Sequence, residues 1–216
     1  MALLFEKEIG FARIAIWEAT ESREQLMRMA GDVVSDPGFA TIISEKRQFE
    51  WLAVRVLLRL MVGSEIKLDY LPDGAPVLAG NPSRISISHT GKYIAVILHP
   101  DHRCGIDIEM KNRSVERVAR RFLSAEEWAN CSKSVDCNRM MLLHWCAKEA
   151  AFKMIPHSDI DFAQHINLMA GEFYSAGGAL NGSYLKGGRS VGFEVKYFIF
   201  DELIIAWCSA PDTIFE

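Results

Sequence analysis

The stretch Gly105-Ile106-Asp107-Ile108-Glu109 lies near the middle of the 216-residue chain. Its isoleucines alternate with carboxylates, a period of two that is typical of a β-strand with one apolar and one polar face. The pattern places both carboxylates on one side of the strand, about 7 Å apart at roughly 3.3 Å of rise per residue. Side chains at this spacing can converge on a single cation. The same alternation also fits the solvated face of an ordinary edge strand.

A second stretch, Trp145-Cys146-Ala147-Lys148-Glu149-Ala150-Ala151-Phe152-Lys153, is rich in Ala and Lys and contains no β-branched residue. This composition favours a helix. Glu149 and Lys153 are four residues apart and therefore share one helix face. A third carboxylate and an amine can thus meet the strand pair, and such oxygen ligands suit Mg²⁺ bound to a pyrophosphate. The simpler interpretation is a surface ion pair, which stabilises a helix only weakly.

Together, the two stretches indicate a function more specifically than either stretch does alone. Asp107 and Lys148 are separated by 41 positions (148 − 107), and a serine–histidine motif precedes both. Gly-Ile-Asp-Ile-Glu followed by Trp-x-x-Lys-Glu-Ala-x-x-Lys resembles the signature of the phosphopantetheinyl transferases. Within that family it is more similar to the larger, surfactin-synthetase-activating type than to the small trimeric holo-acyl-carrier-protein synthases. The resemblance extends from about Ser44 to Lys153 and includes Asp73-Gly74-Ala75-Pro76, Ile85-Ser86-Ile87-Ser88-His89-Thr90-Gly91 and Arg121-Phe122-Leu123-Ser124-Ala125-Glu126-Glu127.

The resemblance implies a Mg²⁺-dependent enzyme that transfers the phosphopantetheine arm of coenzyme A to a serine of an apo acyl or peptidyl carrier protein. Adenosine bisphosphate would be released. Asp107, Glu109 and Glu149 would ligate the metal, and Asp107, Glu149 and Lys153 would form the catalytic set. Glu149 is expected to be the base for the serine proton. Lys153 would balance the charge on the leaving phosphate. The acceptor can belong to fatty-acid, polyketide or peptide synthesis.

A basic helix is predicted from the N-cap Ser44 to Val62. Basic helix faces are commonly just solvated. In the family, however, basic residues of this region hold the ribose phosphate of coenzyme A. The resemblance therefore makes Arg47 the first candidate for that contact, with Lys46 and Arg55 behind it.

Ser88 and His89 lie at the turn end of a predicted hairpin, formed by strands at 84–88 and 94–98. A single histidine is more often structural or exposed. The family motif Ser-His-Thr-Gly, which contacts coenzyme A phosphates, favours a binding role for both residues here. Ala75 stands where the family usually has a basic residue, so the usual nucleotide contact at that position is expected to be weaker or made elsewhere.

The order of elements predicts an α+β fold of two similar α/β subdomains related by pseudo-twofold symmetry, spanning residues 1–103 and 104–216. Each half has a helix that contains a tryptophan, Trp51 or Trp145, followed by a hairpin, at 85–98 or 191–209. The active site is expected in the cleft between the two halves. The sequence also predicts several local elements: a first strand at 10–18 that includes Phe11, helices at 22–29, 114–122 and 139–154, and a loop at 132–138. It further predicts a capping box from Ser124 to Glu127, which has a purely structural explanation.

Composition narrows the class of protein. Half of the residues are hydrophobic and the formal net charge is −4, which does not indicate nucleic-acid binding. The five cysteines follow no metal-ligand spacing, so we expect reduced thiols in a cytoplasmic monomer without a signal peptide or a membrane span. Two alternatives are a non-catalytic module that binds coenzyme A or another nucleotide, and a structural protein. The complete set of three carboxylates argues against the first, and only exposed charge pairs favour the second.

Overall fold

The computed structural model describes residues 2–63, 67–156, 159–169 and 176–215. Its contacts divide the chain into unit 1, Met1–Pro100, and unit 2, Asp101–Glu216. The sequence analysis predicted this boundary between residues 103 and 104. Helices and antiparallel sheets occur in both units, which confirms the predicted α+β class. In the described part of the chain, no helix is long and apolar enough to span a bilayer.

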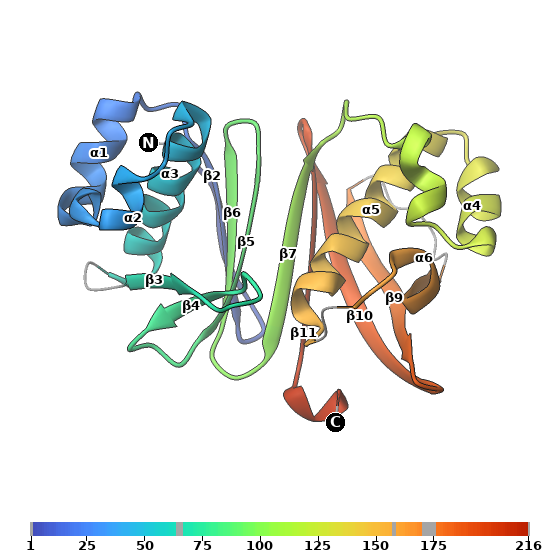
Figure 1. The fold of residues 1–216 in the computed structure, drawn as a ribbon. Coiled ribbons are helices and arrows are strands. Elements are labelled where there is room, and N and C mark those ends of the chain that lie inside the picture. Colours follow the sequence, from blue (N-terminus) through green and yellow to red (C-terminus); the bar gives the residue numbers. More distant parts are fainter. Residues whose placement is uncertain (1, 64–66, 157–158, 170–175, 216) are drawn as a thin grey trace. The chain divides into compact units, whose positions relative to one another are not determined.

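Unit 1 is an antiparallel sheet of order β1-β2-β6-β5 with helices packed on one face (Figure 1). The long helix α3 presents Leu52 and Leu57 to a core that includes Trp17 and Val96 of the sheet. A two-stranded sheet of β3 and β4 follows α3. The elements are β1 (Ala2–Ile9), β2 (Ala12–Glu18), α1 (Arg23–Ala30), the 3₁₀ helix η1 (Gly31–Ser35), α2 (Pro37–Ala40), α3 (Glu45–Val62), β3 (Lys67–Tyr70), β4 (Pro76–Ala79), β5 (Arg84–Thr90) and β6 (Tyr93–His99).

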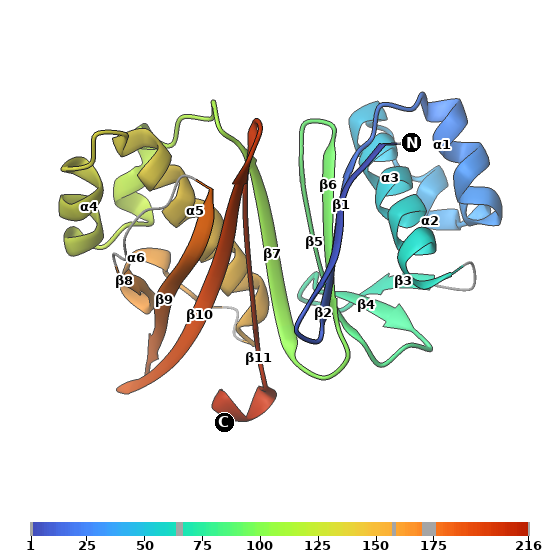
Figure 2. The same cartoon turned by 180° about the vertical axis from the view of Figure 1, so that it is seen from behind.

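Unit 2 is an antiparallel sheet of order β7-β11-β10-β9-β8, with the long helix α5 across one face. Figure 2 shows the opposite side, where β9, β10 and β11 lie in front of α5. Apolar residues of α5, such as Leu143 and Ala147, form a core with Val195 and Ile204 of the sheet. The elements are β7 (Arg103–Met110), η2 (Glu116–Arg121), α4 (Ala125–Ser132), α5 (Cys137–Met154), α6 (Phe162–His165), β8 (Ile166–Met169), β9 (Gly177–Lys186), β10 (Arg189–Phe200), β11 (Leu203–Ala210) and η3 (Asp212–Ile214).

The long helices and the hairpins agree with the sequence prediction, whereas the first strand does not. The side chain of Ser44 accepts a hydrogen bond from the N–H of Arg47, so the predicted N-cap of α3 is confirmed. The first strand of the structure is β1, which the sequence analysis missed. The strand predicted at 10–18 is β2, and the first two residues of the predicted range belong instead to the turn before β2. Phe11 lies in that turn and is 82% exposed, so its assignment to the first strand was wrong.

Two predictions between β7 and α5 also need correction. The helix predicted at 114–122 is the short 3₁₀ helix η2, whose N-cap Val115 has no side-chain acceptor for the first N–H groups. The predicted loop at 132–138 is shorter, because α4 continues through Ser132 and α5 begins at Cys137. Asp136 accepts from the N–H of Arg139 and so begins α5 earlier than the sequence pattern indicated.

The approach of β7 to α5 is unusually close at Gly105. A Cβ atom at this position would lie 1.8 Å from the carbonyl oxygen of Ala150 and 3.1 Å from the backbone nitrogen of Met154. Only glycine lets the two backbones pass at this distance. Since side chains alternate along a strand, Gly105, Asp107 and Glu109 share the face of β7 that α5 covers.

We expect Gly105→Ala to destabilise the protein by about 3 kcal/mol, because the new methyl group would overlap backbone atoms of α5 that cannot rotate away. Urea unfolding followed by circular dichroism measures the change in the free energy of unfolding. Gly192→Ala in β10 is the matched control, since a Cβ there meets nothing within 4 Å. It should change stability by less than about 0.5 kcal/mol. Equal effects of the two substitutions would contradict the close approach at Gly105.

Candidate active site

The two carboxylates of β7 are buried although β7 is an edge strand of its sheet. Asp107 and Glu109 are each 5% exposed. Asp107 Oδ1 accepts a hydrogen bond of 2.8 Å from Lys153 Nζ, which also donates to the carbonyl oxygen of Ile106 at 2.9 Å. The interpretation of this strand as a solvated edge is therefore wrong. Helix α5 covers its polar face and supplies a cation to it.

Glu149 of α5 belongs electrostatically to the same cluster. Burial, together with the neighbouring Asp107 and Glu109, raises the pKa of its carboxyl to about 6, while Lys153 and Arg113 act in the opposite direction. Lys153 forms its salt bridge with Asp107 and is only 26% exposed. The interpretation of Glu149 and Lys153 as a surface ion pair is therefore wrong. The sequence prediction that strand and helix carboxylates come together is consistent with this geometry.

Sequence reasoning missed two partners of Glu109. Trp145 Nε1 donates to Glu109 Oε1 at 2.9 Å, and Arg113 forms a salt bridge with the same carboxylate. The Arg113 guanidinium also lies 5.5 Å from the centre of the Trp145 ring. The hydrogen bond to Glu109 raises the pKa of Arg113 further. Trp145 was visible as the first residue of the helix motif, and Arg113 as the basic residue four positions after Glu109.

The donor set of this cluster fits a hard divalent cation. Carboxylate oxygens are the ligands that Mg²⁺ prefers, usually one or two of them together with substrate phosphates. Burial is the main cause of the raised pKa of Glu149, and repulsion from Asp107 and Glu109 adds to it; such a cation would neutralise the excess negative charge behind that repulsion. Among the described residues, no group of three or more His, Cys, Asp or Glu side chains is arranged so that it could hold a metal ion. Lys153 and Arg113 carry the positive charge that balances Asp107 and Glu109 in this structure.

Lys148, the residue before Glu149, lies on a different face of α5 and is fully buried. Its ammonium group donates to Glu127 Oε2 at 2.7 Å, to the carbonyl oxygen of Phe122 at 2.7 Å and to that of Phe162 at 2.9 Å. Burial lowers the pKa of Lys148, and Glu127 opposes that effect. Each of the three ammonium hydrogens thus has an acceptor, which identifies Lys148 as a structural residue.

Glu127 completes this buried network. Its other oxygen accepts from the N–H of Leu168 at 2.8 Å, and Oε2 also accepts from the N–H of Ser124 at 2.7 Å. The predicted capping box between Ser124 and Glu127 is confirmed. The sequence could not indicate that the capping glutamate also pairs with Lys148 and binds β8.

The predicted coenzyme A residues all lie in unit 1, where two of them share a partner that the sequence analysis missed. Lys46 Nζ and His89 Nδ1 lie 3.6 Å and 3.5 Å from the same oxygen of Glu50. Lys46 is one helical turn before Glu50, and His89 is in β5. The Glu50 carboxylate therefore holds two predicted phosphate-binding groups side by side. Its position four residues after Lys46 was the available sequence signal.

The other three predicted residues differ in their surroundings. Arg47 is exposed in the first turn of α3, and Ser88 is buried in β5. The Arg55 guanidinium lies 3.4 Å from the centre of the Trp51 ring and donates to the carbonyl oxygen of Leu68. Burial lowers the pKa of Arg55. Arg55 thus makes interior contacts, whereas Arg47 is open to a ligand.

Comparison with protein families gives one match. Residues 103–208 match the family model described as the 4'-phosphopantetheinyl transferase superfamily. This part of the chain, from the start of β7 to Cys208 of β11, is therefore a domain of that superfamily and contains Asp107, Glu109, Glu149 and Lys153. The predicted transferase family is confirmed at this level. No curated protein matches the chain.

We expect Lys148→Met to destabilise the protein by about 3–5 kcal/mol, because it leaves the Glu127 carboxylate buried without its cation. Thermal and urea unfolding measure the loss. The double variant Glu127→Gln/Lys148→Met should recover part of it by removing the unpaired charge. Lys133→Met, at an exposed lysine after α4, is the control and should change stability by less than about 0.5 kcal/mol. A single variant as stable as the control would contradict the structural role of Lys148.

Proposed function

We propose that the protein transfers the phosphopantetheine group of coenzyme A to a serine of an apo carrier protein and releases adenosine bisphosphate. The observation that carries the proposal is the partly buried cluster of Asp107, Glu109, Glu149 and Lys153 within the superfamily domain. Pure binding of a nucleotide does not require three carboxylates on one face of a strand–helix pair. Such a set suits phosphoryl transfer, because carboxylates can hold the divalent cation that neutralises the charge of the reacting phosphates.

Asp107, Glu109 and Glu149 would hold Mg²⁺. When bound, this ion would neutralise the pyrophosphate of coenzyme A and polarise the phosphorus that is attacked. The chain's own residues prepare the ligands: Trp145 fixes one oxygen of Glu109, and Lys153 orients Asp107. Because both ligands are held before substrate arrives, little reorganisation is needed on binding.

Glu149 would accept the proton of the acceptor serine. The serine oxygen then forms a bond to the β-phosphorus of coenzyme A, the bond from that phosphorus to the bridging oxygen breaks, and adenosine bisphosphate leaves with the electron pair. With a pKa of about 6 the Glu149 carboxyl is ionised at neutral pH and can therefore accept a proton, and a bound cation would favour the same ionised form. Lys153 would balance the charge that develops on the leaving phosphate.

The coenzyme A phosphates would be bound by His89, Lys46 and Arg47, with Ser88 nearby. We place Arg55 last, because its guanidinium already contacts Trp51 and Leu68. We further propose that the protein is of the larger, surfactin-synthetase-activating type. Its two units would then be related by pseudo-twofold symmetry, with the substrate in the cleft between them.

The test is an intact-mass assay with the purified protein, coenzyme A, Mg²⁺ and an apo carrier protein. We expect the carrier to gain one phosphopantetheine group, and Asp107→Ala to reduce the rate by on the order of a hundredfold or more while the protein stays folded. Glu194→Ala removes an exposed carboxylate of β10 and should leave the rate unchanged. Mg²⁺ must be titrated to saturation for each variant. Binding of coenzyme A without transfer to any carrier would favour the non-catalytic module instead.

A second prediction concerns Glu50. Glu50→Gln should raise the Michaelis constant for coenzyme A by up to about fivefold, since exposed ion pairs are worth about 0.2–1 kcal/mol. The catalytic constant should change little, because Glu50 lies in unit 1 and orients Lys46 and His89 rather than the reacting atoms. Glu45→Gln, in the first turn of the same helix, is the matched control. If both variants have the same Michaelis constant, Glu50 does not orient the coenzyme A site.

A further inference from the structure

Arg113 is a cation of the carboxylate cluster to which the proposed transfer assigns no role. Its guanidinium forms a salt bridge with Glu109 Oε1, and the carboxylates of Asp107 and Glu149 also interact with it electrostatically. The Arg113 side chain is 46% exposed, whereas the Glu109 side chain is 6% exposed. Arg113 therefore extends from the buried edge of the cluster to the solvent, where a ligand can reach it.

Contacts on several sides hold Arg113 in this position. Its N–H donates to the carbonyl oxygen of Met110 at 2.9 Å, and its carbonyl oxygen accepts from Asn138 Nδ2 at 3.2 Å. The guanidinium lies 5.5 Å from the centre of the Trp145 ring, within the range of a cation–π contact. Both the backbone and the side chain of Arg113 are thus placed before a ligand arrives, which lowers the entropic cost of binding.

The salt bridge is not the only contact that orients Glu109. Trp145 Nε1 donates to the same oxygen, Oε1, at 2.9 Å. Removal of the Arg113 guanidinium would leave this hydrogen bond in place and would take away a positive charge beside the carboxylate. A divalent cation at Glu109 would then meet less repulsion. In the intact protein, Arg113 and such a cation compete for the same negative charge.

A pyrophosphate group would end this competition. A guanidinium group binds phosphate oxygens in a bidentate manner, so a pyrophosphate beside the cluster would supply Arg113 with a second anionic partner. Glu109 would then be available to the divalent cation. The exposed position of Arg113 at the edge of the carboxylate cluster suits a group that exchanges one anion for the other.

We propose that Arg113 binds the pyrophosphate of coenzyme A and thereby makes binding of the divalent cation depend on coenzyme A. Without coenzyme A, Arg113 pairs with Glu109 and weakens the affinity of the cluster for the cation. With coenzyme A, its guanidinium contacts the phosphate oxygens instead. This inference rests on the proposed function, since coenzyme A is the ligand that it assigns to Arg113.

Two binding measurements on the full chain test this role. The affinity for Mn²⁺ alone is measured from the electron paramagnetic resonance signal of the free ion, and the affinity for coenzyme A at saturating Mg²⁺ by isothermal titration calorimetry. We expect Arg113→Gln to bind Mn²⁺ about fivefold more tightly than the wild type, at the low end of the usual coupling between two sites. It should bind coenzyme A about tenfold more weakly, because hydrogen bonds to a charged group are lost. A general structural defect would weaken both affinities.

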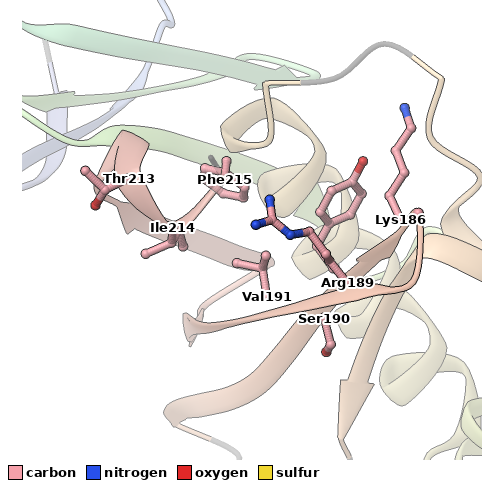
Figure 3. Close-up of a pocket in the computed structure, with 9 residues that line it drawn as sticks. Lys186, Arg189, Ser190, Val191, Thr213, Ile214 and Phe215 are labelled. Carbon is pink, nitrogen blue, oxygen red and sulfur yellow. The ribbon is translucent and has the colours of Figure 1, made fainter.

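Three further variants serve as controls. Arg113→Lys keeps the charge and should recover most of the wild-type behaviour in both measurements. Arg117→Gln, at an exposed arginine of η2, is the matched control and should change neither affinity. Lys186→Gln examines a pocket of about 570 Å³ at the turn end of the β9–β10 hairpin, which Lys186 and Arg189 line (Figure 3). It should leave the affinity for coenzyme A unchanged, because none of the lining residues belongs to the carboxylate cluster.

The proposal is overturned if Arg113→Gln binds Mn²⁺ no more tightly than the wild type does. It is equally overturned if this variant binds coenzyme A as tightly as the wild type. Neither measurement needs a carrier protein or turnover. Opposite changes of the two affinities in a protein that modifies no carrier would therefore support the role of Arg113 and contradict only the proposed transfer.

Discussion

The ammonium group of Lys148 is the contact on which the arrangement of unit 2 depends. With Glu127 it joins α5 to the end of η2, the start of α4, the first turn of α6 and strand β8. The side chains of Lys148 and Glu127 lie out of water, so their hydrogen bonds are both stronger and less dispensable than those at the surface. The network fixes the rotation of α5 about its axis. Once that rotation is fixed, Glu149 and Lys153 can only point toward β7.

The two charged residues at the centre of the helix motif therefore have different roles. Successive residues of a helix are about 100° apart, so Lys148 faces the interior while Glu149 faces the strand carboxylates. The close passage of β7 at Gly105 then sets the distance between strand and helix. The same motif thus contains a residue that supports the fold and a residue of the candidate site. Lys148 and Glu149 are neighbours in the sequence, but their roles differ because their surroundings differ.

Local patterns predicted part of this arrangement. Alternation predicted that Asp107 and Glu109 share a face, and the spacing of the helix motif placed Glu149 and Lys153 on one stripe. The N-cap at Ser44 was equally visible, because capping depends on residues within one turn. Strand β1 was missed, since Lys7 and the glutamates around it interrupt its apolar pattern. Strand β1 is stabilised by its pairing with β2. A pattern of neighbouring residues cannot predict such a pairing.

The partners of the site residues could not be predicted for the same reason. Trp145, Arg113 and Glu50 act through contacts between segments that are distant in sequence or turn back after a strand. A lysine in a helix is usually a surface residue, so the burial of Lys148 could not be predicted from composition. Arg55 is a similar case, because its position on a basic helix did not indicate that its guanidinium lies on Trp51.

The carboxylate cluster has a thermodynamic consequence for the protein itself. The pKa of Glu149 is raised from 4.5 to about 6 in the folded state, so folding favours the protonated carboxyl. The contribution of this group to stability is therefore present below about pH 4.5 and is lost as the pH rises through about 6. At neutral pH the ionised group opposes folding, and a bound cation would reverse that effect by favouring the carboxylate. Residues selected for stability alone would not produce this cluster, whereas a site that binds a cation and a phosphate would.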